Sequence, residues 1–227
     1  MNNTLTTPNS TPTATEKTEV KAIQPILVWD FPTRIFHWTL AICFAGAIIT
    51  QDMESLRIVH NTCGYTMLGL VAFRIIWGLI GTKHARFASF VPSPKRVFAY
   101  IKGLLTKKPI HTVGHNPLGA LDVLLILSLV IGVATSGIML DGGFAEELFE
   151  EVHEFLANLL LLVIGVHVLG VLFSSFTHKE NLIKSMISGY KLGDASEGIR
   201  RTFWWLGLAM ILGVGYFWAI QLRLITI

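Results

Sequence analysis

Hydrophobic residues are gathered into five long segments that are separated by shorter polar stretches. The segments cover residues 35–50, 58–80, 117–140, 152–176 and 202–221. An apolar stretch of about 20 residues is long enough to cross the hydrocarbon core of a bilayer as a helix. A helix also satisfies its own backbone hydrogen bonds, which lipid cannot do. The pattern therefore predicts an all-α integral membrane protein with five transmembrane helices.

The fourth segment, residues 152–176, contains two histidines in a strongly apolar context. His153 and His167 are fourteen residues apart, and Glu154 is the only formal charge of the segment. At about 100° and 1.5 Å per residue, both imidazoles lie on one helix face, roughly 21 Å apart along the axis. One such histidine is compatible with an ordinary buried residue that has found a partner. Two in register, matched on other segments, indicate stacked metal centres, one near each membrane face.

The charges between the segments predict how the chain crosses the membrane. Residues 82–116 carry seven Lys and Arg and no Asp or Glu, whereas residues 141–154 carry six acidic residues. Basic connections stay on the cytoplasmic side, so we expect a cytoplasmic N-terminus and an acidic outer surface. Within the basic connection, residues 93–108 are amphipathic. They either lie flat on the lipid of the inner leaflet or form an ordinary solvated loop.

The histidines of the spans are expected at two different depths in the membrane and so form two layers. His60 and His153 begin the second and fourth segments on the outer side. His37 and His167 lie in the inner halves of the first and fourth segments. Each layer thus holds two imidazoles from different helices. Because pairs of neutral imidazole hold six-coordinate haem that is suited to electron transfer, the pattern indicates one non-covalent haem in each layer.

Two arginines lie where they could neutralise the inner haem. Arg74 follows His60 by fourteen residues, so it faces the same way about 21 Å deeper in the membrane. Arg34 precedes His37 by three residues and shares its helix face. A guanidinium group inside an apolar span needs an anion. A haem propionate would serve for either arginine.

Two glycines and a polar pair complete the candidate site. Gly64 and Gly170 each follow a histidine by about one turn, and a missing side chain would let a porphyrin plane approach the helix. Helix packing is the alternative explanation for each glycine. His115 and Asn116 precede Pro117, and this arrangement is that of an ordinary helix N-terminus. The functional alternative is that His115 and Asn116 offer hydrogen bonds to a quinone carbonyl beside the inner haem.

Composition supports the membrane class. Of the 227 residues, 52% are hydrophobic and 15% are charged, with a mean hydropathy of +0.58. There is no room for a large soluble domain beside the spans, and nothing predicts a nucleic-acid partner. Cys43 and Cys63 lie inside spans without a CxxC or CxxCH context, so we interpret them as small core residues. Residues 1–27 are rich in small polar residues and are expected to form a disordered cytoplasmic tail.

Several motifs resemble one bacterial family. This family is the membrane cytochrome b family, which includes the b-type cytochrome subunit of nickel–iron hydrogenases and related quinol-oxidising cytochromes. The segments of this chain that resemble it are WDFPTRIFHW, HNTCGY, FRIIWGLIG, GHNPLGA, EVHEFLANLLL, HVLG and ENLIKSMISG. The resemblance covers residues 28–189 and leaves residues 190–227 as a connection and a fifth helix outside it. It implies a four-helix bundle in the bacterial inner membrane that binds two b haems and exchanges electrons with quinone. When the haem ligands of the family are matched to this chain, the resemblance implies that they are His37, His60, His153 and His167.

We interpret the chain as a transmembrane di-haem cytochrome b, an electron-transfer subunit with quinol or quinone oxidoreductase activity. It would carry electrons between membrane quinone and a redox protein on the outer face, such as a c-type cytochrome or a hydrogenase or dehydrogenase subunit. One alternative is a transporter whose histidines bind a metal or relay protons. Against it, the histidines form two layers, with no Asp or Glu expected to line the spans between them. Another alternative is an oxidoreductase that acts on superoxide at the outer haem.

Overall fold

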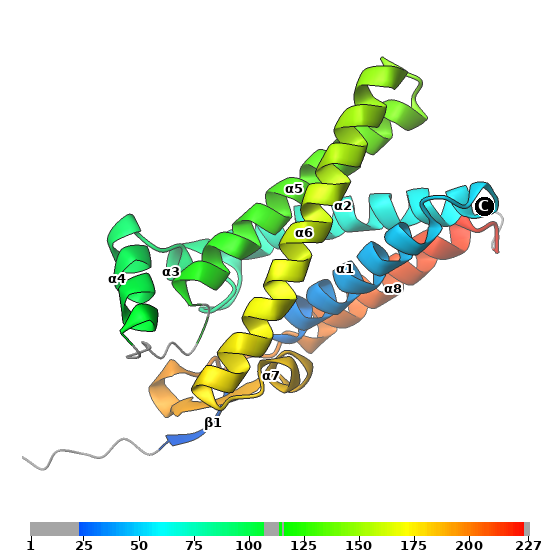
Figure 1. Cartoon of the computed structure of the whole chain (residues 1–227). Coiled ribbons are helices and arrows are strands. Elements are labelled where there is room, and N and C mark those ends of the chain that lie inside the picture. Colours follow the sequence, from blue (N-terminus) through cyan, green and yellow to red (C-terminus); the bar gives the residue numbers. More distant parts are fainter. Residues whose placement is uncertain (1–22, 107–113, 115, 225–227) are drawn as a thin grey trace, which may run out of the picture.

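The chain folds into a bundle of long helices with a small sheet at one end (Figure 1). The computed structural model describes residues 23–106, 114 and 116–224. Within these residues, five helical segments are long and apolar enough to cross a membrane. The helices concerned are α1 (Phe31–Thr50), α2 (Arg57–Ile80), α5 (Pro117–Asp141), α6 (Glu146–His178) and α8 (Trp204–Gln221). The prediction of an all-α membrane bundle with an additional fifth spanning helix is therefore confirmed.

Shorter elements connect the long helices. They are the strands β1 (Ile23–Leu27) and β2 (Tyr190–Asp194), the 3₁₀ turns Glu54–Leu56 and Ala195–Glu197, and the helices α3 (Phe87–Phe90), α4 (Pro94–Leu105) and α7 (Leu182–Ser188). The amphipathic part of the basic connection thus forms a helix, α4, over most of its length. Phe98 of α4 is exposed, whereas Tyr100 is buried and burial raises the pKa of its phenol.

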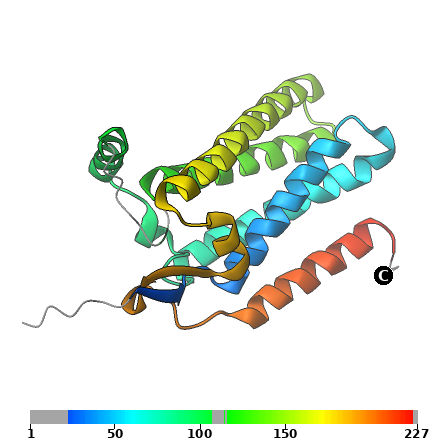
Figure 2. The same ribbon diagram turned by 60° about the horizontal axis from the view of Figure 1, so that its bottom comes forward.

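The long helices pack in a continuous series. Helix α1 packs against α2 and α8, α2 packs against α5, and α5 packs against α6, an order that can be followed in Figures 1 and 2. We call the end near the strands the sheet end; it holds the first residues of α1, α5 and α8 and the last residues of α2 and α6. The opposite end, where α5 turns into α6 and α2 begins, is called the tip end. Each long helix therefore runs from one end to the other.

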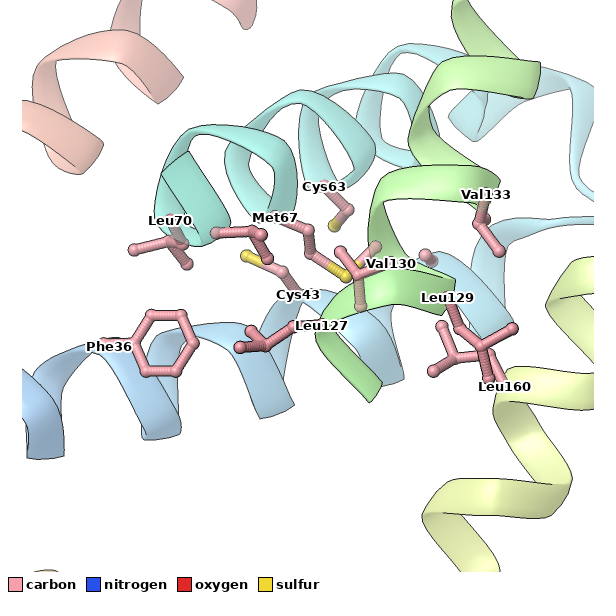
Figure 3. Close-up of a cluster of buried hydrophobic side chains, with 12 residues drawn as sticks. Phe36, Cys43, Cys63, Met67, Leu70, Leu127, Leu129, Val130, Val133 and Leu160 are labelled. Atoms are coloured by element: carbon pink, nitrogen blue, oxygen red, sulfur yellow. The ribbon is translucent and has the colours of Figure 1, made fainter. Parts of the chain in front are cut away.

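The core lies between α1, α2, α5 and α6 (Figure 3). Its buried residues include Phe36, Cys43, Cys63, Val71, Val130 and Leu160. Both cysteines are free and buried, as expected for small core residues. By contrast, only 11% of the most apolar stretch of α6 and 6% of that of α8 are buried inside the protein. Such apolar, externally facing helices suit a lipid environment, because lipid covers the remaining apolar side chains.

Polar side chains fix where two of the spanning helices begin. The Asp30 carboxylate accepts a hydrogen bond from the Thr33 backbone amide at 2.8 Å and so caps α1. It also accepts bonds from Trp77 Nε1 at 3.0 Å and Thr82 Oγ1 at 2.5 Å, which ties the start of α1 to the end of α2. Asn116 Oδ1 accepts from the Gly119 amide at 2.7 Å and caps α5. The helix start predicted at Asn116 and Pro117 is confirmed.

The sheet corrects the predicted extent of the disordered tail, which was expected to run to residue 27. Residues 23–27 instead form β1, which pairs antiparallel with β2 from Ile23 opposite Asp194 to Leu27 opposite Tyr190. The physical reason is burial, because Ile26 and the following Val28 and Trp29 pack on Met186. The rest of the expected tail, residues 1–22, lies outside the described residues.

Helix α6 is longer than predicted. It begins at Glu146 rather than near Val152, because the acidic residues of its first turns are good helix formers and favour a helix N-terminus. At about 1.5 Å per residue, its 33 residues extend over roughly 50 Å. This is longer than the hydrocarbon core of about 30 Å, so part of α6 lies beyond that core.

Candidate functional site

The histidines of α2 and α6 meet at the tip end. The ring centroids of His60 and His153 are 6.3 Å apart, with an angle of 63° between the ring planes. An imidazole nitrogen ligates a metal at about 2.0–2.1 Å, and the ring centre lies roughly 1 Å further back. Two imidazoles on opposite sides of one metal ion therefore have centroids about 6 Å apart. The spacing of His60 and His153 fits this arrangement.

Each tip-end imidazole is oriented by a backbone carbonyl. His60 Nδ1 lies 3.0 Å from the Ala47 carbonyl oxygen, and His153 Nδ1 lies 3.0 Å from that of Val133. Ser136 Oγ is 3.1 Å from the same His153 nitrogen. A carbonyl can only accept, so Nδ1 carries the proton and Nε2 keeps its lone pair. This is the usual way in which proteins prepare histidine as a metal ligand.

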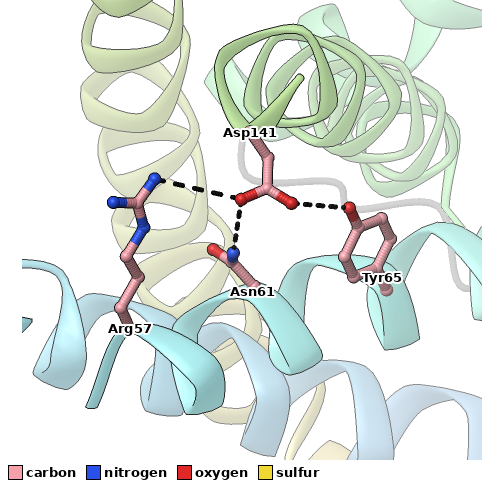
Figure 4. Close-up of polar contacts among 4 residues, drawn as sticks. All are labelled: Arg57, Asn61, Tyr65 and Asp141. Atoms are coloured by element: carbon pink, nitrogen blue, oxygen red, sulfur yellow. Dashed lines mark hydrogen bonds and ion pairs between the residues drawn. The ribbon is translucent and has the colours of Figure 1, made fainter. Parts of the chain in front are cut away.

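A polar cluster beside the tip-end histidines joins α2 to α5 (Figure 4). Asn61 Nδ2 and Tyr65 Oη donate hydrogen bonds to the Asp141 carboxylate at 3.0 and 3.2 Å, and Arg57 Nη2 lies 3.9 Å from it. His60 lies between Arg57 and Asn61 in the sequence, so the cluster fixes the turn of α2 that carries His60. Asp141, which belongs to the acidic segment predicted from the sequence, therefore makes contacts within the protein.

The second pair of predicted ligands, His37 and His167, lies toward the sheet end. His37 comes from α1 and His167 from α6. His37 Nδ1 is buried and has no hydrogen-bond partner among the described residues. His167 Nδ1 lies 2.5 Å from Asp122 Oδ2. Helix α6 thus contributes one histidine to each pair, as the fourteen-residue spacing predicts.

Asp122 is a site residue that the sequence reasoning missed. It lies in α5, and its side chain is 20% exposed where it meets His167. The signal was present in the sequence, because Asp122 is an acidic residue within an otherwise apolar segment. Asp122 does not lie between the two histidine layers, where an acidic residue would favour a proton or metal pathway, but at the depth of one layer beside His167. The contact joins residues 45 positions apart, so no local pattern reveals it.

The two predicted arginines both lie at the sheet end and keep unused donors. Arg74 is 2% exposed, and its guanidinium lies 4.9 Å from the ring centroid of Phe87 and 5.8 Å from that of Phe90. Among the described residues, Arg74 Nη1 and Arg34 Nε are buried without a hydrogen-bond partner. A buried guanidinium with a free donor is costly unless an anion satisfies it. An anionic group at the sheet end would satisfy both.

Glycines near the histidines fall into two kinds. A Cβ placed on Gly64 or Gly170 would meet no atom within 4 Å, so the space beside these predicted glycines is open. A Cβ on Gly137 would lie 3.1 Å from Cε1 of His153. Gly137 was not predicted; it lets the His153 ring lie close against α5. The alternative explanation for Gly64 and Gly170 was tight helix packing. Among the described residues, no neighbouring helix lies close enough to either glycine to support it.

The polar pair predicted at the start of α5 is described only in part. His115 lies outside the described residues. Asn116 caps α5 through its oxygen and also lines a small cavity of about 30 Å³ at the sheet end. Other residues of this cavity are Ser174, His178, Glu180 and Lys191. Lys191 Nζ and Glu180 Oε2 form an ion pair at 3.0 Å. His178 is half-buried at the end of α6.

These residues fit haem better than a bare metal ion. Within the described ranges, no group of three or more His, Cys, Asp or Glu could hold a metal ion alone. Two imidazoles complete a metal's coordination only where a cofactor supplies the remaining ligands, as a porphyrin does. Three of the four imidazoles have Nδ1 engaged, and Gly64 and Gly170 leave open space. The unsatisfied arginine donors suit carboxylates such as propionates.

Comparison with known proteins gives a consistent family assignment. A family model described as prokaryotic cytochrome b561 matches residues 28–189. The probable Ni/Fe-hydrogenase B-type cytochrome subunit of Rhizobium leguminosarum bv. viciae is 24% identical, over 74% of this chain and 90% of its own length. The protein of the same name in Azotobacter vinelandii is 24% identical, over 77% of this chain and 91% of its own length. The probable Ni/Fe-hydrogenase 1 B-type cytochrome subunit of Escherichia coli (strain K12) is 25% identical, over 40% of this chain and 49% of its own length.

Proposed function

The chain belongs to the prokaryotic cytochrome b561 family, and on that basis we propose that it carries electrons across the membrane through two haems. As a member of this family it is a multi-pass bacterial membrane protein that holds b-type haem. The observation that supports the proposal is the close approach of His60 and His153 at the tip end, with His37 and His167 lying toward the opposite end and α6 contributing a histidine at each end. A chain with a single centre would need only one such pair.

The proposed ligands are His60 and His153 for the tip-end haem, and His37 and His167 for the sheet-end haem. Haem, when bound, supplies an iron that takes up and releases one electron. The carbonyls of Ala47 and Val133 hold the tip-end imidazoles in the tautomer that leaves Nε2 free. Arg34 and Arg74 would bind the propionates of the sheet-end haem through their unused donors.

Charge supports a cytoplasmic sheet end. The connection that joins α2 to α5 at this end carries seven Lys and Arg and no acidic residue. The tip end carries the exposed Glu146, Glu147, Glu150 and Glu151. Under the positive-inside rule the basic end faces the cytoplasm. The N-terminus would then be cytoplasmic, and the membrane would be the bacterial inner membrane.

The two ends would serve different electron partners. At the sheet end, Asn116 and His115 would hydrogen-bond a membrane quinone, with the polar cavity of His178, Glu180 and Lys191 beside it to exchange protons with the cytoplasm. At the tip end, the acidic surface would dock a redox protein on the outer face. The names of the relatives make a hydrogenase subunit the first candidate for that protein. A c-type cytochrome or another dehydrogenase subunit is the alternative.

Haem content and ligand variants test the proposal directly. We expect pyridine haemochrome analysis of the purified protein to give two b haems per chain. His60→Ala and His153→Ala should remove one spectral component, and His37→Ala and His167→Ala should remove the other. His84→Ala is the matched control, because His84 lies outside the spans and bonds to the Glu197 carbonyl. A count of one haem or none, or loss of the same component in His37→Ala and His60→Ala, would contradict the proposal.

A further inference from the structure

The two histidine pairs differ in the charge of the groups that orient them. At the tip end, His60 and His153 bond to backbone carbonyls and a serine hydroxyl, all of which are neutral. At the sheet end, His167 bonds to the carboxyl group of Asp122 at 2.5 Å. No other hydrogen bond or ion pair involves the Asp122 side chain among the described residues. The asymmetry is therefore built from one residue.

The position of Asp122 is unusual for an acidic residue. It is the sixth residue of α5, whereas the other acidic residues of the spanning helices lie in the last turn of α5 or in the first three turns of α6. A carboxylate within a membrane helix is costly without a partner and is generally found where it pairs with another group. His167 is that partner, and its imidazole N–H donates to the carboxylate. A solvent-exposed role does not account for this placement, because the Asp122 side chain is only 20% exposed.

We propose that Asp122 is a positioning residue for the sheet-end haem, that it orients His167 as a haem ligand and that its charge lowers the midpoint potential of that haem. This inference rests on the proposed function, in which His167 ligates iron. The hydrogen bond fixes the ring with Nδ1 toward α5 and leaves Nε2 free, as an outer-shell carboxylate does for other metal-bound histidines. A negative charge beside the ligand stabilises the oxidised, more positive state of the haem over the reduced state.

The consequence is a difference between the two centres that their ligands alone would not produce. Both centres would have two imidazole ligands, so ligand type cannot separate their potentials. Hydrogen bonding and nearby charge remain as the adjustable factors. Asp122 acts on the sheet-end haem only, because His153, the α6 ligand at the other end, bonds to Val133 and Ser136 instead.

Potentiometric titration of the purified holoprotein, followed by haem absorbance, tests the role of Asp122. In Asp122→Asn we expect the sheet-end haem to be reduced more easily by at least tenfold, which corresponds to about 59 mV for a one-electron step. The tip-end haem should titrate as in the wild type. Electron paramagnetic resonance of the oxidised protein should show a changed low-spin signal for the sheet-end haem alone. Asp122→Glu, which keeps the charge, should return the potential toward the wild-type value.

Asp141→Asn is the matched control. Asp141 lies at the other end of α5 and bonds to Asn61 and Tyr65 but to no histidine. Loss of its charge should leave the sheet-end potential unchanged. An unchanged sheet-end potential in Asp122→Asn, or a shift at the tip-end haem instead, would overturn the proposal.

Loss of haem from Asp122→Asn is also decisive. Loss of the sheet-end haem alone, with recovery of that haem in Asp122→Glu, supports a positioning role. Loss of both haems, or no recovery in Asp122→Glu, overturns it. Failure of the proposed function would look different, because a wild-type protein with fewer than two haems, or a His167→Ala variant that keeps both, refutes the ligand assignment whatever Asp122 does.

Discussion

Arg74 is a buried cation with a hydrogen-bond donor that no described residue of the protein satisfies. Its guanidinium is buried over the rings of Phe87 and Phe90, and its Nη1 has no hydrogen-bond partner among the described residues. Stacking on aromatic faces compensates part of the cost of burying the charge. It does not satisfy the N–H donors, which remain available to an anionic ligand. A propionate of the sheet-end haem is the group that we propose.

Arg74→Gln should lower the midpoint potential of the sheet-end haem. Removing a nearby cation favours the oxidised, more positive state, and a unit charge at roughly 10 Å with an effective dielectric constant of 20 contributes between about 1 and 2 kcal/mol. Redox titration of the variant measures the shift. Arg57→Gln serves as the control, because Arg57 is an exposed cation at the tip end. A higher potential, or a shift confined to the tip-end haem, would count against the contact.

The residues of the site divide into those that spacing predicts and those that only packing reveals. The fourteen-residue interval between His153 and His167 predicts two depths on one helix face, and Asn116 before Pro117 is recognisable as a helix cap. Asp122 and Gly137 act through contacts between helices. Such contacts depend on how α5 rotates against α6, which the sequence of neither helix specifies alone.

At the scale of elements, the sheet shows what local patterns cannot predict. Strands β1 and β2 are separated by most of the chain, yet their residues pair in register. The long helices were predictable because a continuous apolar stretch of about 20 residues is by itself the signal of a membrane-spanning helix. A two-stranded sheet depends on a partner far away in sequence, so residues 23–27 gave only a short apolar run that looked like the end of a polar tail.

A histidine contact ties the loop after α2 to the turn after β2. His84 Nε2 lies 2.8 Å from the carbonyl oxygen of Glu197. Burial lowers the pKa of His84 from its usual 6.5, and the charges of Lys83 and Lys191 act in the same direction. The Glu197 carbonyl opposes this shift but does not reverse it. His84 is therefore neutral in the folded protein at a pH where it is already protonated in the unfolded chain.

The contact should make stability depend on pH in a defined direction. Because the folded-state pKa is lowered, the contribution of His84 is complete above pH 6.5 and is lost as the pH falls below that value toward the folded-state pKa. Thermal unfolding in detergent at pH 7.5 and 5.5 measures the effect. His84→Gln, which keeps an N–H donor but cannot titrate, should lose less stability than the wild type between these values. A greater loss in the variant would contradict the prediction.

At the scale of the whole molecule, the two ends of the bundle differ in charge and in what surrounds the histidines. The tip end presents Glu146, Glu147, Glu150 and Glu151 on the first turns of α6, and all four are exposed. The exposed apolar side chains of Phe144 and Leu148 lie among them. Asp141 is not counted in this docking surface, because its carboxylate accepts hydrogen bonds from Asn61 and Tyr65 within the protein. A mixed acidic and apolar surface next to His153 is suited to a partner with a basic rim.

Charge removal on this surface should slow electron exchange with the outer partner. Changing Glu146, Glu147, Glu150 and Glu151 to Gln removes attraction that acts mainly on the association rate. The effect should be largest at low salt and small at physiological ionic strength, where charges are screened over about 8 Å. Stopped-flow reduction or oxidation by the partner measures it. Reaction with quinone should keep its wild-type rate.

Variants at Asn116 should give the opposite result. Asn116→Leu removes the amide proposed to bind quinone, but it also removes the cap of α5, which is worth about 1 kcal/mol. Asn116→Ser keeps a capping oxygen and loses only the amide, so it separates the two effects. Both variants should slow haem reduction or oxidation by quinone, and only Asn116→Leu should lower the thermal stability. If Asn116→Ser keeps the wild-type quinone rate, or if the glutamate variant is the one that slows it, quinone does not bind at the sheet end as proposed.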